Sequence, residues 1–303
     1  MTGVATILGD ARLASRRRTE TAWRFILLGT ALFVVGILLF LLYRLLADGV
    51  PHLSRSFFFE DYKPSALTRS GAARGVVAGI KDSIIASLYM LGMTMLAAIP
   101  VGTAAGIYLH EYAPANRFTN LLRTTISNLA GVPSVVYGLL GLAVFVRLLD
   151  MGVNLMAAAL TLAVLIVPIL IVATEEALKT VPASVREASL ALGATKWQTI
   201  RKHVLPYALP GILTGNILAM SRAAGETAPL LVIGVPAYVT ITATSPLDAG
   251  TPLQVRSYFL ASDARIPAIE MAAASVVVLL VATLLLNLVA IVLRQVLSKR
   301  IKW

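Results

Sequence analysis

The 303-residue sequence contains no cysteine and only three histidines. Without cysteine, the chain can form neither a disulfide framework nor a thiolate metal site. The histidines, at positions 52, 110 and 203, are scattered along the chain and lack the spacing of metal ligands. No grouping of histidine, aspartate and serine indicates catalysis either. We therefore expect no metal centre, no catalytic residues and no bound cofactor.

Charged residues are scarce as well, at 14% of the chain against 58% hydrophobic residues. Several apolar runs exceed the roughly 20 residues that a helix needs to cross a membrane. These runs are continuous rather than alternating, which favours helices over the strands of a barrel. The sequence predicts an all-α integral membrane protein with six transmembrane helices, at residues 23–46, 83–109, 121–149, 155–178, 207–233 and 266–296.

The segments outside these spans set the expected orientation. The first apolar run is too long for a signal peptide, so we expect a retained anchor. Residues 1–22 and 297–303 are basic tails, and the positive-inside rule places both termini in the cytoplasm. In this arrangement residues 47–82 form an extracytoplasmic loop and residues 83–296 the transmembrane core. The cytoplasmic segments then hold 16 Lys+Arg and six acids, close to the whole net charge of +11, so a nucleic-acid partner is not needed.

Pairs of glycines four residues apart lie in two of the spans. Gly102 and Gly106 are in the second span, and Gly211 and Gly215 open the fifth. Such pairs let helix backbones approach closely. We expect them to serve helix packing rather than to contact a substrate.

The connection between the fourth and fifth spans, residues 179–206, carries consistent helix signals. Ser184 with Glu187 fits a capping box, and Thr195 with Gln198 fits a second one. Gly193, between them, suits a left-handed helix end. The sequence therefore predicts two short helices separated by a glycine, lying at the cytoplasmic surface.

The stretch "EASLALGATKWQTIRKHVLP" in this connection resembles the EAA loop of ABC importer permeases. Five residues match at the family spacing: Glu187, Ala188, Gly193, Leu205 and Pro206. Ser189 replaces the usual second alanine, and His203 stands where isoleucine is common. The resemblance implies a coupling helix that docks on a separate ATPase. The alternative is an amphipathic surface helix whose basic residues contact the anionic head groups of membrane lipid.

The chain has no G-x-x-x-x-G-K-[ST] phosphate loop and cannot act as its own P-loop ATPase. The resemblance implies that ATP is bound by the partner, of which two copies are expected.

Two charges stand inside the predicted fifth span, in "SRAAGETAPL". Arg222 and Glu226 are four residues apart and so share one helix face. An arginine at the centre of a spanning helix costs about 2.5–3.5 kcal/mol on insertion scales. Intramembrane charges usually face a bundle interior or a wet cavity and mark a substrate pathway. The alternative is a purely structural pair. We also expect Pro229 to kink this span.

The same stretch is similar to the phosphate-specific branch of the permease family. The matching residues are Arg222, Gly225, Glu226, Thr227, Ala228, Pro229 and Leu230. "NLAGVPSVVYGLLG", residues 128–141 of the third span, is also similar to that branch, through Gly131, Pro133, Ser134, Tyr137 and Gly138. We take Arg222, Glu226, Thr227, Asn128 and Ser134 as candidate pathway residues. For the last three, hydrogen bonding between helices is an equal alternative.

The resemblance implies the type I ABC importer permease fold, in the cytoplasmic (inner) membrane of a bacterium. Within the branch the chain resembles the PstA-type subunit, which pairs with a PstC-type permease to form half of the pathway each. An extracytoplasmic phosphate-binding protein would deliver the substrate. The alternatives are a permease for sulfate or molybdate and an ion-coupled secondary transporter. The latter predicts more intramembrane acids and internal repeats than the sequence holds.

Overall fold

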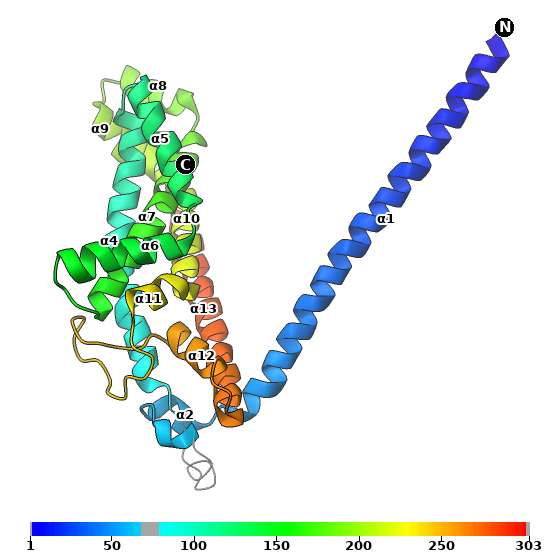
Figure 1. Ribbon diagram of the computed structural model, residues 1–303. Helices are drawn as coiled ribbons and strands as arrows, with labels where there is room; N and C mark the ends of the chain where they lie inside the picture. The colour runs from blue at the N-terminus through cyan, green and yellow to red at the C-terminus, as the bar shows by residue number, and fades with distance from the viewer. Residues whose placement is uncertain (1, 68–78, 301–303) are drawn as a thin grey trace. The chain divides into compact units, whose positions relative to one another are not determined.

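The computed structural model describes residues 2–67 and 79–300, and the described part consists of helices and connections without strands (Figure 1). Residues 68–78 of the expected outer loop, residues 301–303 of the C-terminal tail and Met1 lie outside the described residues. In chain order, the helical elements are α1 (Thr2–Gly49), η1 (Val50–His52), α2 (Arg55–Phe59), η2 (Pro64–Leu67), α4 (Lys81–Ile107), η3 (Tyr108–Tyr112), α5 (Arg117–Ala130), α6 (Ser134–Gly141), η4 (Leu142–Leu148), α7 (Leu155–Lys179), α8 (Ala183–Ala191), α9 (Lys196–Thr199), η5 (Ile200–Val204), α10 (Leu205–Gly225), α11 (Ala228–Ile233), α12 (Leu253–Ala261) and α13 (Ile266–Arg300).

The chain divides into two compact units, residues 1–48 and 49–303. The first unit is a single helix, α1, which runs without a break through both the expected tail and the expected first span. The second unit holds all the other elements. η3, η4 and η5 are π-helical turns that continue α4, α6 and α9.

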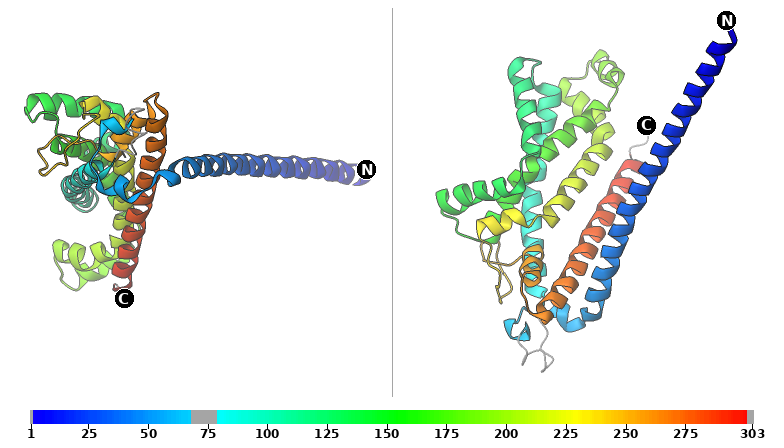
Figure 2. Two further views of the ribbon diagram at one scale, coloured as in Figure 1. Left: turned by 90° about the horizontal axis from the view of Figure 1, so that it is seen from below. Right: turned by 45° about the vertical axis from the view of Figure 1, so that its right-hand side comes forward.

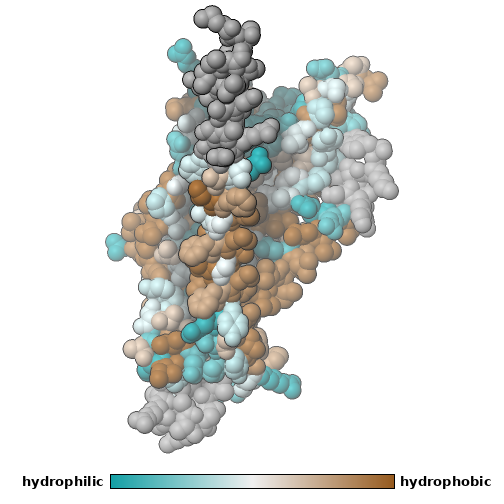
Figure 3. Space-filling model, turned by 90° about the vertical axis from the view of Figure 1, so that its right-hand side faces the viewer, coloured by the Kyte–Doolittle hydropathy of each residue, from teal (hydrophilic) through white to brown (hydrophobic). Residues whose placement is uncertain are grey.

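Five helical stretches among the described residues are long and apolar enough to cross a membrane. They are Glu20–His52, Lys81–Tyr112, Leu155–Lys179, Lys196–Gly225 and Ile266–Val296. Figure 3 shows apolar residues along the middle of the long helices that it displays, with hydrophilic residues towards their ends. The chain is therefore a multi-pass membrane protein, and five of the six expected spans correspond to long helices.

The third expected span, 121–149, is wrong as a continuous helix. α5 ends at Ala130 and α6 begins at Ser134, and the two are bent by 100° at the break. The cause is local, because Pro133 has no amide hydrogen and restricts Val132 to extended backbone. The apolar residues continue across the break, and for this reason the sequence predicted one continuous helix.

The fifth expected span, 207–233, is also interrupted. α10 ends at Gly225, Glu226 is extended, and a separate helix, α11, begins at Ala228. Pro229 does not kink a continuous helix as expected. It lies in the first turn of α11, where backbone amides make no hydrogen bond within the helix, so the missing amide hydrogen of proline costs nothing there. In Figure 1 and the right-hand view of Figure 2, α6 and α11 run across the direction of α4, α7 and α10.

α7 is the most buried of the long helices, and both α4 and α10 pack against it. The four glycines lie at these crossings, as the helix-packing interpretation expected. A β-carbon added at Gly102 would lie 2.5 Å from Cβ of Leu170, and one at Gly215 would lie 2.4 Å from Cβ of Ala173. Gly106 and Gly211 contact α7 in the same way, at Thr174 and Ala177. The absence of side chains at these glycines thus lets the backbones of α4 and α10 approach α7 closely.

Changing Gly102 to alanine is therefore expected to destabilise the chain by about 1–3 kcal/mol, the usual cost of overpacking. Gly92 on the same helix is the matched control, since a β-carbon there meets nothing within 4 Å. Gly92→Ala should leave stability unchanged or raise it, because alanine is the better helix former. Thermal unfolding of the purified variants measures both. Equal melting temperatures for the two variants would refute the close packing of α4 on α7.

Candidate functional site

The intramembrane charges meet where α10 ends. Nε of Arg222, in the last turn of α10, lies 3.1 Å from Oε1 of Glu226, just beyond that helix. The positive charge of Arg222 interacts favourably with the negative end of the helix dipole, which lies at the C-terminus of α10. Its side chain is 44% exposed and that of Glu226 18% exposed. Within this chain, therefore, the pair is not enclosed by the helices of its own bundle.

The two stretches that carry the resemblance to the phosphate branch lie against each other. Gly138 of α6 packs so closely on α11 that an added β-carbon would lie 2.8 Å from Cα of Pro229. Tyr137 spans the α5–α6 break by donating its hydroxyl hydrogen to the carbonyl oxygen of Leu129, at 2.9 Å. Its ring belongs to the same buried cluster as Ala223, the neighbour of Arg222. The two helix interruptions, far apart in sequence, therefore form one region.

The other candidate pathway residues lie around the interruptions. Thr227 precedes α11 and is half-buried, next to the ion pair in sequence. Ser134 is the first residue of α6 and is half-buried, whereas Asn128 is exposed in the last turn of α5. Ser134 and Asn128 thus flank the break between α5 and α6, and Thr227 lies in the break between α10 and α11.

The connection 179–206 folds as two short helices, and Gly193 has the expected left-handed backbone, with φ of +82°. The second capping box is confirmed, since Thr195 and Gln198 exchange hydrogen bonds of 2.9 and 3.3 Å. The first is wrong: α8 begins at Ala183 with Pro182 at its N-cap position. Ser184 is thereby already inside the helix and cannot cap it.

Ser189, one of the departures from the family pattern, joins the two short helices. Its hydroxyl is buried and shares a 2.9 Å hydrogen bond with that of Thr199. Leu205 and Pro206 begin α10 and are half-buried. Glu187, Ala188 and Gly193 are exposed. One side of the loop is thus packed against the rest of the chain, and the other side is exposed.

Charged groups that the sequence did not pair fix this loop to the long helices. Arg186 of α8 donates to Oε1 of Glu111 at 2.8 Å and to the carbonyl oxygen of Val181 at 2.8 Å. Glu111 lies in η3, the π-helical turn that continues α4, and is 8% exposed. Arg186 is thus engaged within the protein, instead of being available to lipid head groups.

Two further contacts lie at the same end of the molecule. Nε of Arg123 in α5 donates to Oε1 of Glu175 in α7 at 3.0 Å. Nζ of Lys196 lies 4.9 Å from the ring centre of Tyr112. The first contact connects α5 to α7, and the second connects α9 to η3, the turn that continues α4.

The outward side of the loop carries large apolar side chains. Leu192 is 89% exposed, and Leu190 and Trp197 are about half exposed. An apolar surface on a rigid, internally bonded helix pair is typical of a protein-binding site.

At the opposite end of the second unit, near α2 and α12, a buried ion pair was missed. Nη2 of Arg256 in α12 donates to Oδ2 of Asp82 at 2.5 Å, and the two side chains are 0% and 2% exposed. Arg256 also donates to the carbonyl oxygens of Ala237 and Val239 and to Ser83. The only signal in the sequence is an arginine inside the short, mainly apolar run "PLQVRSYFL".

Tyr62 completes this cluster. Cζ of Arg256 lies 3.9 Å from the centre of its ring, and its backbone amide donates to Oδ1 of Asp82 at 3.2 Å. Burial raises the pKa of Tyr62 to about 12, so the phenol stays neutral beside the ion pair. Arg256 therefore joins α12, the start of α4, the segment after α2 and the segment after α11.

The arrangement of helices is that of the transmembrane subunits of type I ABC importers. It resembles a chain of the MetNI methionine ABC transporter in an inward-facing conformation, with a TM-score of 0.56 over 70% of this chain and 94% of the other, at 24% identity. The chain belongs to the family of binding-protein-dependent transport system inner membrane components, whose model matches residues 98–303.

Relatives extend the similarity beyond the matched family region. The chain is 37% identical over 227 residues to a probable ABC transporter permease protein, YqgI, of Bacillus subtilis, covering 74% of each. It is 33% identical over 289 residues to the phosphate transport system permease protein PstA of Yersinia pestis, covering 93% of this chain and 94% of the relative. The chain is thus a non-catalytic permease subunit, which works with a substrate-binding protein and an ATPase.

Proposed function

We propose that the chain is the PstA-type permease subunit of an ATP-driven phosphate importer in the bacterial inner membrane, with both termini in the cytoplasm. The observation that carries the proposal is the Arg222–Glu226 pair at the junction of the two interrupted helices. The similarity to phosphate permeases over nearly the whole chain supports it. The chain moves its substrate and makes or breaks no bond in it.

The chemistry of the ion pair suits phosphate. The planar guanidinium of Arg222 can donate two hydrogen bonds to phosphate oxygens. Glu226 holds the guanidinium through Nε and leaves its outer nitrogens for the anion. Phosphate retains a proton near neutral pH, so its P–O–H group can donate a hydrogen bond to the carboxylate of Glu226. Sulfate carries no such proton, so the carboxylate disfavours it.

The exposure of Arg222 supports a second permease subunit. A charge on a membrane-spanning segment faces a bundle interior or a wet cavity. Arg222 is 44% exposed in the single chain, which supports a pathway that another subunit helps to enclose. We take a PstC-type chain as this partner, so that the pathway runs between the two.

The exposed side of α8 and α9 is the proposed docking surface for one of two ATPase subunits. Leu192, Leu190 and Trp197 supply its apolar contacts. The hydrogen bond between Arg186 and Glu111 connects α8 to the turn that continues α4. A short helix tied in this way transmits a displacement of the ATPase to the spanning helices instead of absorbing it.

Changing Glu111 to glutamine is expected to lower the amount of phosphate carried per ATP hydrolysed, because α8 loses its charged partner at the end of α4. Glu176→Gln is the matched control, since Glu176 is 62% exposed in its pair with Lys179. The ratio of transport to hydrolysis in proteoliposomes measures the effect. An unchanged ratio in Glu111→Gln, at equal assembly, would count against the mechanical role of this contact.

Uptake by proteoliposomes tests the proposed function itself. They would contain this chain, a PstC-type permease and the ATPase, with binding protein outside and ATP inside. We expect uptake of labelled phosphate that stops without ATP, and little uptake of sulfate or molybdate. Uptake of another oxyanion in preference to phosphate would contradict the proposal while keeping the coupling loop intact.

A further inference from the structure

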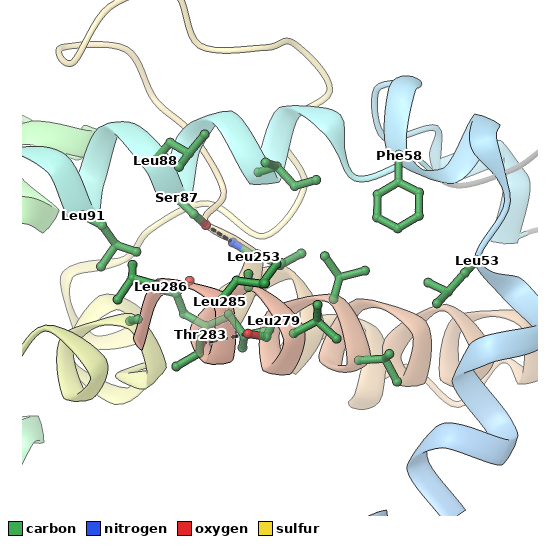
Figure 4. A pocket seen from close by; sticks show the side chains of 17 residues that line it. Leu53, Phe58, Ser87, Leu88, Leu91, Leu253, Leu279, Thr283, Leu285 and Leu286 are labelled. Atoms are coloured by element: carbon green, nitrogen blue, oxygen red, sulfur yellow. Dashed lines mark hydrogen bonds between the residues drawn. The ribbon is translucent and has the colours of Figure 1, made fainter. Parts of the chain in front are cut away.

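A cavity of about 520 Å³ lies between α4, α12 and α13, and Phe58 and Ala224 are also among its lining residues. Figure 4 shows side chains from α4 and α13 facing each other across it. Among the residues that the structure describes, no charged side chain lines it. Two of its polar side chains are engaged within the protein: Ser87 accepts from the amide of Leu253, and Thr283 donates to the carbonyl oxygen of Leu279. The cavity therefore does not suit the transported anion, which would lose its hydration without gaining a counter-charge.

Gln254 of α12 lines the same cavity and is 3% exposed. Neither polar atom of its side-chain amide has a hydrogen-bond partner among the residues that the structure describes. An unpaired buried amide is costly, so native structures nearly always provide it with a partner. The unpaired amide points to a ligand that supplies a polar group inside an otherwise apolar cavity.

The walls of the cavity indicate where the ligand comes from. α4 and α13 are both helices of membrane-spanning length. Leu88 on α4 and Leu285 on α13 line the cavity and are 67% and 54% exposed, so it opens on the outer side of these helices. In a bilayer, lipid acyl chains surround spanning helices wherever no other helix covers them, so lipid can reach this opening. A neighbouring helix is about 10–12 Å across with its side chains, whereas a single acyl chain is narrower and fits an apolar cavity of this size more readily.

We propose that this cavity binds one acyl chain of a membrane glycerophospholipid, with Gln254 hydrogen-bonded at its ester group. The acyl chain fills the apolar part, and the amide nitrogen of Gln254 donates to an ester carbonyl oxygen. The amide oxygen accepts from a head-group hydroxyl or ammonium. Neither Arg222 nor Glu226 lines the cavity, and the proposal does not depend on which ion the subunit carries.

Photolabelling of the assembled transporter tests the site. The probe is a phosphatidylethanolamine with a diazirine on its acyl chain, mixed into phosphatidylethanolamine and phosphatidylglycerol liposomes. We expect labelling of α4 at Leu88–Leu91, reduced several-fold in Ala282→Trp, which fills the cavity from α13. Leu284→Trp is the control, since Leu284 is 58% exposed and lies outside the lining. Equal labelling of both variants, or no labelling of these α4 residues, would overturn the proposal.

Competition between unlabelled lipids tests the role of Gln254. Diester and diether phosphatidylethanolamine with the same chains differ in their carbonyl acceptors. In the unmodified transporter the diester lipid should compete roughly two- to tenfold better, the ratio expected for one net hydrogen bond. In Gln254→Leu the two lipids should compete equally. Equal competition in the unmodified transporter would rule out a hydrogen bond from Gln254 to the ester.

Discussion

Replacing Arg222 with glutamine is expected to lower ATP-driven phosphate uptake about ten- to a hundredfold, because a hydrogen bond to a charged group contributes about 1.5–3 kcal/mol. Glutamine keeps a polar amide, but its side chain is shorter and carries neither the charge nor the guanidinium fork. Arg222→Lys keeps the charge without the fork, so its uptake should lie between the two. Initial rates of labelled phosphate uptake at saturating binding protein measure this effect.

Arg147→Gln provides the control for the loss of one arginine. Arg147 is exposed in the π-helical turn that follows α6, away from the ion pair in sequence. Its uptake should stay close to that of the unmodified subunit. If Arg222→Gln transports phosphate at the unmodified rate, at equal expression and assembly, the pair is structural and the pathway does not depend on it.

Replacing Asp82 with asparagine is expected to destabilise the subunit by about 3–5 kcal/mol, the cost of leaving a buried charge without its partner. Asp82 is 2% exposed and Arg256 is fully buried, so water cannot replace the lost carboxylate. The loss should separate α12 from the start of α4. A lowered melting temperature and a lowered yield of assembled transporter measure it.

Two comparisons separate this effect from the loss of any acidic residue. Asp263→Asn removes one side of the partly exposed Asp263–Arg265 pair and should change stability by about 1 kcal/mol or less. The double variant Asp82→Asn with Arg256→Met removes both buried charges and should be more stable than Asp82→Asn alone. If the double variant is the least stable of the three, the stability of the cluster does not come from the compensation of buried charges.

The sequence predicted the long helices because their apolar runs are continuous and bounded by charge. It also predicted the glycine crossings, whose spacing reflects backbone contact in α4 and α10. It did not predict the interruptions at residues 131–133 and 226–227. Glycine and proline are visible at both places, but the apolar runs continue across them, and hydrophobicity does not distinguish a continuous span from two short helices.

The functional region was predictable only where its residues are close in sequence. The Arg222–Glu226 pair and the Thr195–Gln198 capping box are local, and the structure contains both. The Glu111–Arg186 and Asp82–Arg256 pairs join positions 75 and 174 residues apart. No periodicity or spacing links such positions, so they follow only from the packing of the helices.

The phosphate-to-sulfate uptake ratio of Glu226→Gln tests the central claim most directly, since it asks whether the ion pair selects the substrate. The change removes the carboxylate, which accepts a hydrogen bond from the protonated phosphate oxygen and repels sulfate. The amide of glutamine can instead donate a hydrogen bond to either anion. We expect the ratio to fall about ten- to a hundredfold relative to the unmodified subunit, as for a lost hydrogen bond to a charged group. An unchanged ratio, with uptake otherwise intact, would show that selection takes place elsewhere and would contradict the proposed role of the Arg222–Glu226 pair in choosing the substrate.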